Sequence, residues 1–331
     1  MSLEKLRKLK CITDDILKDE KEQEFISTGV GTLNILFGGA VDRGIPKGKI
    51  SMIAADSSLG KSIISLKIAK NAQKKGMNII LFDTEKAYSK DTAKSIGIDL
   101  EKIIVIQKTS LEEVTTQFMN IMKEIEDEKD DYLFIIDSWN ALVSSKTVDD
   151  ATSGKDVVDM TTAKKKNSFA KLLLNSDATV FIVNQIYSAM SQYELDAIPG
   201  GRGVYFASSC VVQATSKAKD KTSDGEIEGA IITAQTRKGR FAREHSKLKY
   251  LIKYDGGFNP YYGLLDIALE GGFVTKPSVG WYQKANEDKK YREKDLYCKE
   301  FWSDIIASDE FKEYVEKAYS FKHNDFIDED I

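Results

Sequence analysis

One eight-residue stretch constrains the fold of this chain more than any other, because it joins a strand to a helix through a glycine-containing turn. The largely apolar run KISMIAA (49–55) leads into ADSSLGKS (55–62), after which apolar residues return at helical spacing. Backbone N–H groups at such a turn, and at the start of the helix that follows, form a cradle for anions. The stretch therefore predicts a phosphate-binding loop within a strand–loop–helix unit.

The residue types in this loop predict that it binds a nucleoside triphosphate together with its metal ion. Lys61 would reach the β- and γ-phosphates of ATP, and the Ser62 hydroxyl would ligate Mg²⁺. Alanine stands where the pattern usually opens with glycine, and Ala55 fits this position if its φ angle stays negative. The alternative is an ordinary strand–turn–helix with a solvated lysine. The predicted ATP-binding residues of the loop are Ala55, Asp56, Ser57, Ser58, Leu59, Gly60, Lys61 and Ser62.

A series of short apolar runs alternates with helix-length segments and predicts an α/β fold. Such runs are typical of a parallel sheet that helices cover on both faces. Three later runs, at 208–216, 229–239 and 247–255, follow one another with shorter connections and predict an antiparallel extension. The expected fold is thus a mostly parallel, doubly wound sheet with that extension. The predicted strands span 49–55, 78–85, 102–107, 132–137 and 178–185, and the predicted helices span 61–75, 89–97, 111–128 and 157–175.

Polar side chains stand at the ends of three of these predicted strands. Ligands of doubly wound sheets bind at the carboxyl ends of the strands, so we expect Glu85, Asp137 and Gln185 to face the phosphate loop. Asp137 would orient Mg²⁺, Glu85 would be the general base for the attacking water, and the Gln185 amide would sense the γ-phosphate. The alternatives are helix-capping or strand-end acids for the two carboxylates and a polar strand terminus for the glutamine.

Composition restricts the class of protein. The 331 residues are 42% hydrophobic and 30% charged, and no apolar run approaches the length of a membrane span. Three widely separated cysteines (Cys11, Cys210 and Cys298) show neither metal spacing nor a disulfide framework, which favours a reducing cytoplasm. Two histidines leave little material for a histidine-rich metal site. The net charge of −4 argues against a non-specific cationic coat on DNA, but the charge of one local face can still bind nucleic acid.

The two ends of the chain differ in pattern from the middle. Residues 3–22 carry leucine and isoleucine at helical spacing among charges, which predicts an amphipathic arm. We expect this arm to dock on a neighbouring subunit; the alternative is a helix that packs within its own chain. The pattern changes again near Gly263, and a helix is expected at about 299–319. The predicted domains are an oligomerisation arm (1–25), an ATPase core (26–263) and a small C-terminal domain (264–331).

Taken in order, these motifs resemble the core of the RecA-type recombinases. The strand that ends in FDTE (82–85) is similar to the strand that carries the catalytic glutamate of that family, and LFIIDSWNAL (133–142) is similar to its Walker B segment. The C-terminal stretches 255–282 and 297–302 most resemble the recombinases of T-even-type phages. Further similar segments are ISTGVGTLNILFGGAVDRGIPKGKI (26–50), FIVNQIY (181–187) and PGGRGVYFASS (199–209).

The resemblance implies an ATP-dependent filament on single-stranded DNA that pairs this strand with a homologous duplex and exchanges strands. It implies ATP and Mg²⁺ as cofactors, with catalytic roles for Lys61, Glu85 and Gln185. Lys238 and Arg240 match basic residues that cap the nucleotide of a neighbouring subunit, although a solvated basic patch is the alternative. A mediator protein and a single-strand-binding protein are the implied partners. The chain departs from the family at Thr92, where an aromatic ring usually stacks on adenine.

Two long polar segments are the candidates for DNA binding. Residues 144–165 and 186–206 are long for connections inside a compact domain, and such loops are usually functional or disordered. Glycines would let the backbone approach a phosphate, and aromatic and basic side chains would stack on bases or add charge. The alternative is a pair of solvated loops, with the lysines on a helix face. The predicted DNA-binding residues are Lys164, Lys165, Tyr187, Gly200, Gly201, Arg202 and Gly203.

Two other functions remain open at this point. A non-catalytic protein could use ATP as a structural ligand for DNA binding, which Ala55 and Thr92 favour. A hexameric helicase or clock-type ATPase could use the same core. The presence of Lys61, Glu85 and Asp137 together argues against the first, and the amphipathic arm and the glycine-containing loop argue against the second.

Overall fold

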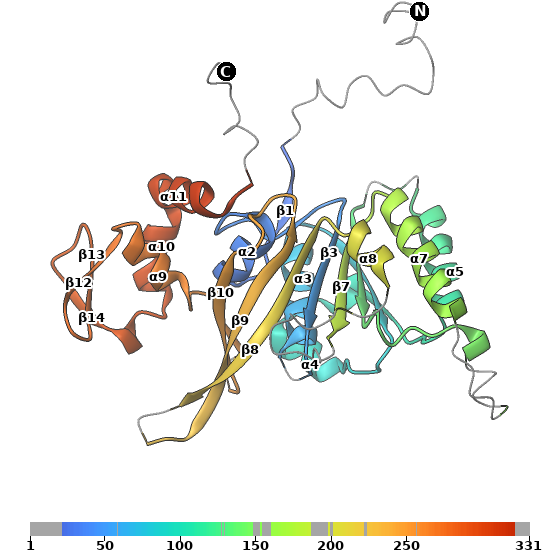
Figure 1. Cartoon of the computed structure of the whole chain (residues 1–331), viewed down its shortest axis with the longest axis horizontal. Helices are drawn as coiled ribbons and strands as arrows, with labels where there is room; N and C mark the ends of the chain where they lie inside the picture. Colours follow the sequence, from blue (N-terminus) through green and yellow to red (C-terminus); the bar gives the residue numbers. More distant parts are fainter. Residues whose placement is uncertain are drawn as a thin grey trace, which may run out of the picture.

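A nine-stranded sheet runs through the protein (Figure 1). Its strand order is β11-β10-β9-β8-β3-β7-β6-β4-β5. The strands from β3 to β5 in this order pair in parallel, β8 continues parallel to β3, and the pairs from β8 to β11 are antiparallel. The mostly parallel sheet with an antiparallel extension is therefore confirmed. The computed structural model describes residues 22–321 except 58, 127, 129, 148–152, 154–159, 187–197, 199–200, 222–223 and 256.

The parallel strands lie close to where the apolar runs predict them. Each is followed by a helix that returns the chain to the other end of the sheet, as a parallel connection requires. Two of the helices begin after a serine that caps the backbone, and one begins just after the phosphate loop. The predicted helix at 111–128 ends at Glu124. The bounds are β3 (Ile50–Ala55), α3 (Lys61–Lys74), β4 (Asn78–Asp83), α4 (Lys90–Ile96), β5 (Ile103–Ile106), α5 (Leu111–Glu124), β6 (Tyr132–Asp137), α7 (Met160–Asn175) and β7 (Thr179–Gln185).

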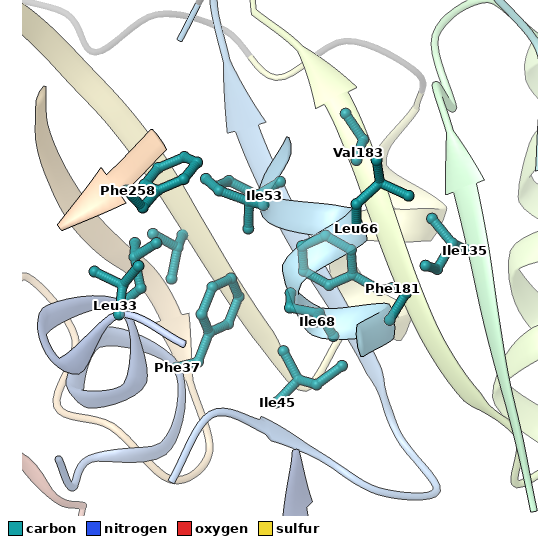
Figure 2. Close-up of a cluster of buried hydrophobic side chains, with 14 of the residues drawn as sticks. Leu33, Phe37, Ile45, Ile53, Leu66, Ile68, Ile135, Phe181, Val183 and Phe258 are labelled. Carbon is teal, nitrogen blue, oxygen red and sulfur yellow. The ribbon is translucent and has the colours of Figure 1, made fainter. Parts of the chain in front are cut away.

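Helices cover both faces of the parallel strands, because successive strand residues point to opposite sides. Ile53 of β3 packs in a cluster with α3 and with α2 (Gly31–Gly38), whereas Met52 packs in a second cluster with α5 and α7. Phe37 of α2 and Phe181 of β7 lie edge to face across the first cluster, which Figure 2 shows in close-up. Burying one such side chain stabilises a fold by roughly 1.5–3 kcal/mol, so this cluster holds α2 and α3 on one face of the sheet.

Two strands of the antiparallel half of the sheet, β8 and β9, are long. A hairpin of β8 and β9 projects beyond the rest of the sheet (Figure 1). Register shifts occur along this pair, which is typical of β-bulges in long twisted strands. The bounds are β8 (Cys210–Lys221), β9 (Ile227–Gly239), β10 (Lys247–Lys253) and β11 (Gly257–Asn259).

The C-terminal part forms a separate apolar cluster at one end of the molecule (Figure 1). Phe301, Trp302 and Phe311 are fully buried in it, together with Ile35 of α2. The single helix predicted at about 299–319 is wrong: Ser308 ends one helix, and its hydroxyl accepts a hydrogen bond from the Phe311 N–H at the start of the next. The elements are α9 (Leu264–Glu270), β12 (Val274–Ser278), β13 (Trp281–Lys284), β14 (Lys290–Arg292), α10 (Lys299–Ala307) and α11 (Asp309–Tyr319).

The expectation of an N-terminal helical arm at 3–22 lies almost entirely outside the described residues, which begin at residue 22. The residues that follow it pair within their own chain. Strand β1 (Phe25–Ile26) is antiparallel to β2 (Ile45–Pro46), and the Lys47 N–H donates to the Glu24 carbonyl at 2.8 Å. The chain is therefore attached to the core from this point onward.

Both segments predicted as DNA-binding loops contain helix. Residues 160–165, expected in the first loop, begin α7. Residues 202–206, expected in the second loop, lie in α8 (Arg202–Ala207). The apolar side chain of Val204 packs on the same cluster as α7, which gives this short helix its support.

Candidate nucleotide and DNA sites

A pocket of about 380 Å³ lies at the carboxyl ends of the parallel strands and brings most of the predicted nucleotide-binding residues together. This is the edge of the sheet where the ends of β3, β4, β6 and β7 meet. Ala55 pairs with Gln185 and Asp83 pairs with Asp137 across neighbouring strands, so residues distant in sequence arrive at one place. The lining residues are Ser57, Gly60, Lys61, Ser62, Ile63, Glu85, Asp137, Gln185, Ala230, Ile252 and Tyr254.

The phosphate loop joins β3 to α3 with a turn that only glycine fits at one position. Gly60 has a φ of +76°, and a Cβ atom there would lie 2.6 Å from Ile252 Cδ1. Ala55 ends β3 as a fully buried strand residue without a positive φ, as an alanine in first place requires. Leu59 is buried against the core. Ser58 lies outside the described residues.

Lys61 begins α3 and points back over the loop. Its Nζ donates to the Asp56 carbonyl oxygen at 2.6 Å. Burial lowers the pKa of this amine, and the nearby carboxylates of Asp137 and Glu85 oppose that effect. The amine is therefore held beside the loop backbone with two carboxylates in electrostatic range.

Glu85 and Gln185, which end two different strands in the predictions, are directly connected. The Ser138 hydroxyl donates to Glu85 Oε1 at 2.5 Å, and Gln185 Nε2 donates to the same oxygen at 2.8 Å. Glu85 stands two residues beyond the end of β4, and its side chain is exposed to the pocket. A carboxylate fixed by two donors in this way keeps one orientation toward the pocket.

Asp137 ends β6 and is buried, with 2% of its surface exposed. Burial raises the pKa of this carboxyl group, while hydrogen bonds from Tyr88 and Ser62 lower it. A hydroxyl and a carboxylate are hard oxygen donors, and Mg²⁺ is usually bound by one or two carboxylates, phosphate oxygens and water. The donor set of Ser62 and Asp137 therefore fits Mg²⁺ carried by a nucleotide. Among the described residues no group of three or more His, Cys, Asp or Glu side chains gathers as a metal site of another kind.

Two residues of this site escaped the sequence reasoning. Tyr254, with 65% of its surface exposed, lines the pocket and also the rim of an adjoining pocket of about 640 Å³ that contains Thr92 and Lys67. Tyr88 reaches Asp137 from the segment after β4. No motif marks either residue; an aromatic residue near the end of a predicted strand, as at KYLIKYD, was the available signal for Tyr254.

Lys238 and Arg240 do not line this pocket. The Lys238 amine donates to the carbonyl oxygens of Tyr205 and Phe206 at 3.2 and 2.7 Å, so it satisfies the C-terminal carbonyls of α8. Burial and the neighbouring Arg240 lower the pKa of this amine. Arg240 directly follows β9, and its side chain is exposed.

The residues predicted to bind DNA separate into three groups. Lys164 is exposed on α7, whereas Lys165 forms an ion pair with Glu112 of α5. Gly201, Arg202 and Gly203 form the start of α8, where the Gly203 N–H donates to Asn167 Oδ1 of α7 at 3.1 Å. Tyr187 and Gly200 lie outside the described residues.

The Asn167 contact places the beginning of α8 directly on α7. A Cβ atom at Gly203 would approach Asn167 Oδ1 to 2.4 Å, so glycine is needed for this contact. Arg202 and Lys164 are both exposed near it. In the described part of the chain, no helix has the length and apolar character needed to cross a membrane.

Comparison with known proteins gives two family matches. A model described as the RecA N-terminal domain matches residues 10–259. A model described as the C-terminal domain of the bacteriophage T4 recombination and repair protein matches residues 261–315.

Individual proteins of the same two kinds are also similar to this chain. The chain is 29% identical over 315 residues to the recombination and repair protein of Enterobacteria phage T4, covering 90% of this chain and 79% of the relative. It is 28% identical to Protein RecA of Aquifex aeolicus over 270 residues, covering 80% of this chain and 75% of the relative. It is 27% identical to Protein RecA of Rhodopirellula baltica over 263 residues, covering 78% of this chain and 68% of the relative.

Proposed function

Because the chain belongs to the RecA family, as the match over residues 10–259 shows, we propose that it is an ATP-dependent DNA recombinase. In this function it assembles as a helical filament on single-stranded DNA and catalyses homologous pairing and strand exchange. One observation carries the proposal: Lys61, Glu85, Asp137 and Gln185 come from four separate segments and line one pocket. A degenerate, non-catalytic site has no reason to keep all four together.

The arrangement of the pocket supports ATP hydrolysis. The backbone around Gly60 and the N-terminus of α3 would hold the phosphates, and Lys61 would release Asp56 to contact the β- and γ-phosphates. Ser62 and Asp137 would hold the Mg²⁺ ion, which when bound neutralises charge on the phosphates. Glu85 would take a proton from the attacking water, and its position is fixed by Ser138 and Gln185.

Gln185 is the proposed connection between the nucleotide and the DNA. Its amide contacts Glu85 at the pocket, and its backbone directly precedes the segment 186–201, which leads to α8. A change at the γ-phosphate would therefore reach the start of α8. Arg202, Gly203 and Lys164 are the described residues that we propose contact the DNA backbone, with Tyr187 and Gly200 from the same segment and Lys165 once it leaves Glu112.

Tyr254 and Thr92 would face the base. The exposed Tyr254 ring stands where pocket and adjoining cavity meet, and aromatic rings stack on bases without regard to sequence. Thr92 lies in the same cavity and is too small to supply the second ring. We propose that the base is held from one side by Tyr254.

Self-assembly is supported by exposed apolar groups at the free edge of the sheet. Ile104 and Val105 of the edge strand β5 are 59% and 45% exposed, and an unpaired strand edge is a template for another chain. Phe206 on α8 is 63% exposed beside Lys238. We propose that the part of the arm that precedes Gln23, where the chain joins its own core, docks at the β5 edge of the next subunit, and that Lys238 and Arg240 act on the neighbour's nucleotide. A mediator and a single-strand-binding protein are the proposed further partners.

The test is ATP hydrolysis by the purified protein with and without single-stranded DNA. We expect strong stimulation by DNA, and a loss of about 100-fold or more in Lys61→Ala, because the phosphate charge then lacks its cation. Lys312→Ala is the matched control, since Lys312 lies on the surface helix α11, far along the chain from the pocket. ATP hydrolysis at the same rate with and without DNA would indicate a different RecA-type motor. DNA binding that requires ATP but occurs without turnover would indicate the non-catalytic protein.

A further inference from the structure

The Tyr88 hydroxyl joins two elements of the nucleotide pocket. It donates a hydrogen bond to Asp137 Oδ2 at 2.5 Å and lies 2.5 Å from the Ser65 hydroxyl. Ser65 is the fifth residue of α3, and its hydroxyl also donates to the Ser62 carbonyl of the first turn at 2.8 Å. The phenol oxygen therefore bridges the end of β6 to the turn that carries Ser62.

The chain holds Tyr88 in this place by a turn built on a buried carboxylate. Asp83 is fully buried at the end of β4, and its oxygens accept the N–H groups of Ala87 at 2.9 Å and Tyr88 at 3.4 Å. Gln107 Nε2 donates to the same carboxylate at 3.1 Å. Lys86, with a φ of +55°, reverses the backbone between them. The turn directs the tyrosine ring inward, where it packs against the core cluster.

The hydroxyl is suited to orient a carboxylate. A phenol hydroxyl is neutral near neutral pH and donates one hydrogen bond, so it can hold the Asp137 carboxylate in one orientation. The Ser62 hydroxyl interacts with both Tyr88 and Asp137. Groups that orient metal-binding carboxylates from behind are worth 10–100-fold in metal affinity in well-studied sites.

We propose that Tyr88 is a positioning residue for the Mg²⁺ ion of the bound nucleotide. Its hydroxyl fixes Asp137 and, through Ser65, the first turn of α3 in the arrangement that the ion requires. Tyr88 does not ligate the ion in this role and does not touch the reacting atoms. The inference rests on the proposed function, because it concerns the same pocket.

The same side chain also faces the free edge of the sheet. Its ring lines a pocket of about 580 Å³ together with Leu81, Ser89 and Val105, beside the exposed strand β5. One residue thus bonds to the metal-binding elements through its hydroxyl and lines a pocket beside the proposed subunit-docking edge.

The test is equilibrium binding of a fluorescent ADP analogue to Tyr88→Phe over a range of Mg²⁺ concentrations, with an EDTA-treated sample as the metal-free reference. Phenylalanine keeps the ring in the core and removes only the hydroxyl. We expect the Mg²⁺ concentration for half-maximal enhancement of binding to rise about 10-fold or more. Affinity for the analogue in EDTA should change less than about twofold, and Ser65→Ala should give a smaller rise in the same direction.

Tyr132→Phe is the matched control, because Tyr132 also bonds a carboxylate, Glu128, but at the opposite end of β6. A Mg²⁺ requirement in Tyr88→Phe no higher than in Tyr132→Phe would overturn the proposal. Equal weakening with and without metal would also overturn it, since the hydroxyl would then serve packing alone. A wild-type protein that binds no nucleotide would overturn the proposed function itself, which is a different failure from a Mg²⁺ response that Tyr88→Phe leaves unchanged.

Discussion

The parallel and antiparallel halves of the sheet differ in how they present functional groups. In the parallel half, Asp137 and Gln185 end their strands, Glu85 lies two residues beyond its strand, and all three meet in the pocket of their own chain. In the antiparallel half, Tyr254 reaches that pocket, but the Lys238 amine is bound to the end of α8. The half with parallel strands therefore supplies the carboxylates and the amide of the pocket within one chain, whereas Lys238 of the other half would need a partner chain or a rearrangement to reach a nucleotide.

This difference follows from topology. Parallel strands all end at one edge of a sheet, so polar residues at their ends lie close together even when they are far apart in the sequence. Antiparallel strands end at opposite edges, so Lys238 at the end of β9 is placed away from Tyr254 at the end of β10. A filament in which each site lies between two chains would bring the two kinds of group together.

The largest effect that tests this comparison is expected in the parallel half, from Glu85→Gln. Removing a general base costs 10²–10⁴-fold in rate, so we expect ATP turnover to fall about 1000-fold. Nucleotide affinity should stay within about threefold, because glutamine can still accept from Ser138 and Gln185. Single-turnover kinetics with a binding assay will separate the two quantities. Unreduced turnover would mean that another group activates the water.

An intermediate effect is expected in the antiparallel half, from Lys238→Ala. A cation supplied in trans contributes 10³–10⁵-fold elsewhere; because Arg240 remains, we expect a loss of only about 10-fold in DNA-stimulated turnover. Affinity of dilute, unassembled protein for nucleotide should not change. Measuring turnover over a range of protein concentrations will show whether the loss appears only on assembly. A loss that is independent of protein concentration would show that Lys238 acts on the nucleotide of its own chain, and the contrast between the two halves would then be wrong.

The smallest expected effect is on the free energy of unfolding. It contrasts the charged groups that line the pocket with a buried charge that lies outside it. Lys166 of α7 is 5% exposed, and burial lowers its pKa from 10.5 to about 8. The folded state therefore holds this proton more weakly than the unfolded state, so the cost is full below pH 8 and declines as the pH rises toward 10.5. We expect Lys166→Met to raise the free energy of unfolding by about 1–3 kcal/mol at pH 7, and by less at pH 9.5.

Urea unfolding at both pH values measures this effect. Lys171→Met is the matched control, since Lys171 is exposed on the same helix. A stabilisation that is equal at the two pH values would show that the added apolar surface, rather than the charge, is responsible.

The parallel half of the fold was predictable because its strands are short, apolar and followed by helices of ordinary length. β6 and β7 lie within a residue of their predicted bounds. The break at Ser308 was missed because apolar spacing continues through it; only the capping serine marks the division. The start of α8 was missed because glycines suggested a loop, whereas Gly203 is required by its close approach to Asn167.

The candidate site was predictable to the extent that its residues follow strand ends. Tyr88 and Tyr254 were not predicted, because neither belongs to a motif: Tyr254 lines the pocket and Tyr88 bonds to Asp137 through tertiary contacts alone. The ion pair between Lys165 and Glu112 was likewise not predicted, since the two residues lie 53 positions apart on different helices.

The location of the pocket at strand ends has a consequence for how such a chain can diverge. A residue inserted into β6 would reverse the facing of the side chains that follow it in that strand and detach Asp137 from its partners. Residues inserted into the connections at 148–159 or 187–200 would leave the strand ends where they are. Selection can therefore lengthen or shorten these connections while the distances within the pocket are inherited unchanged.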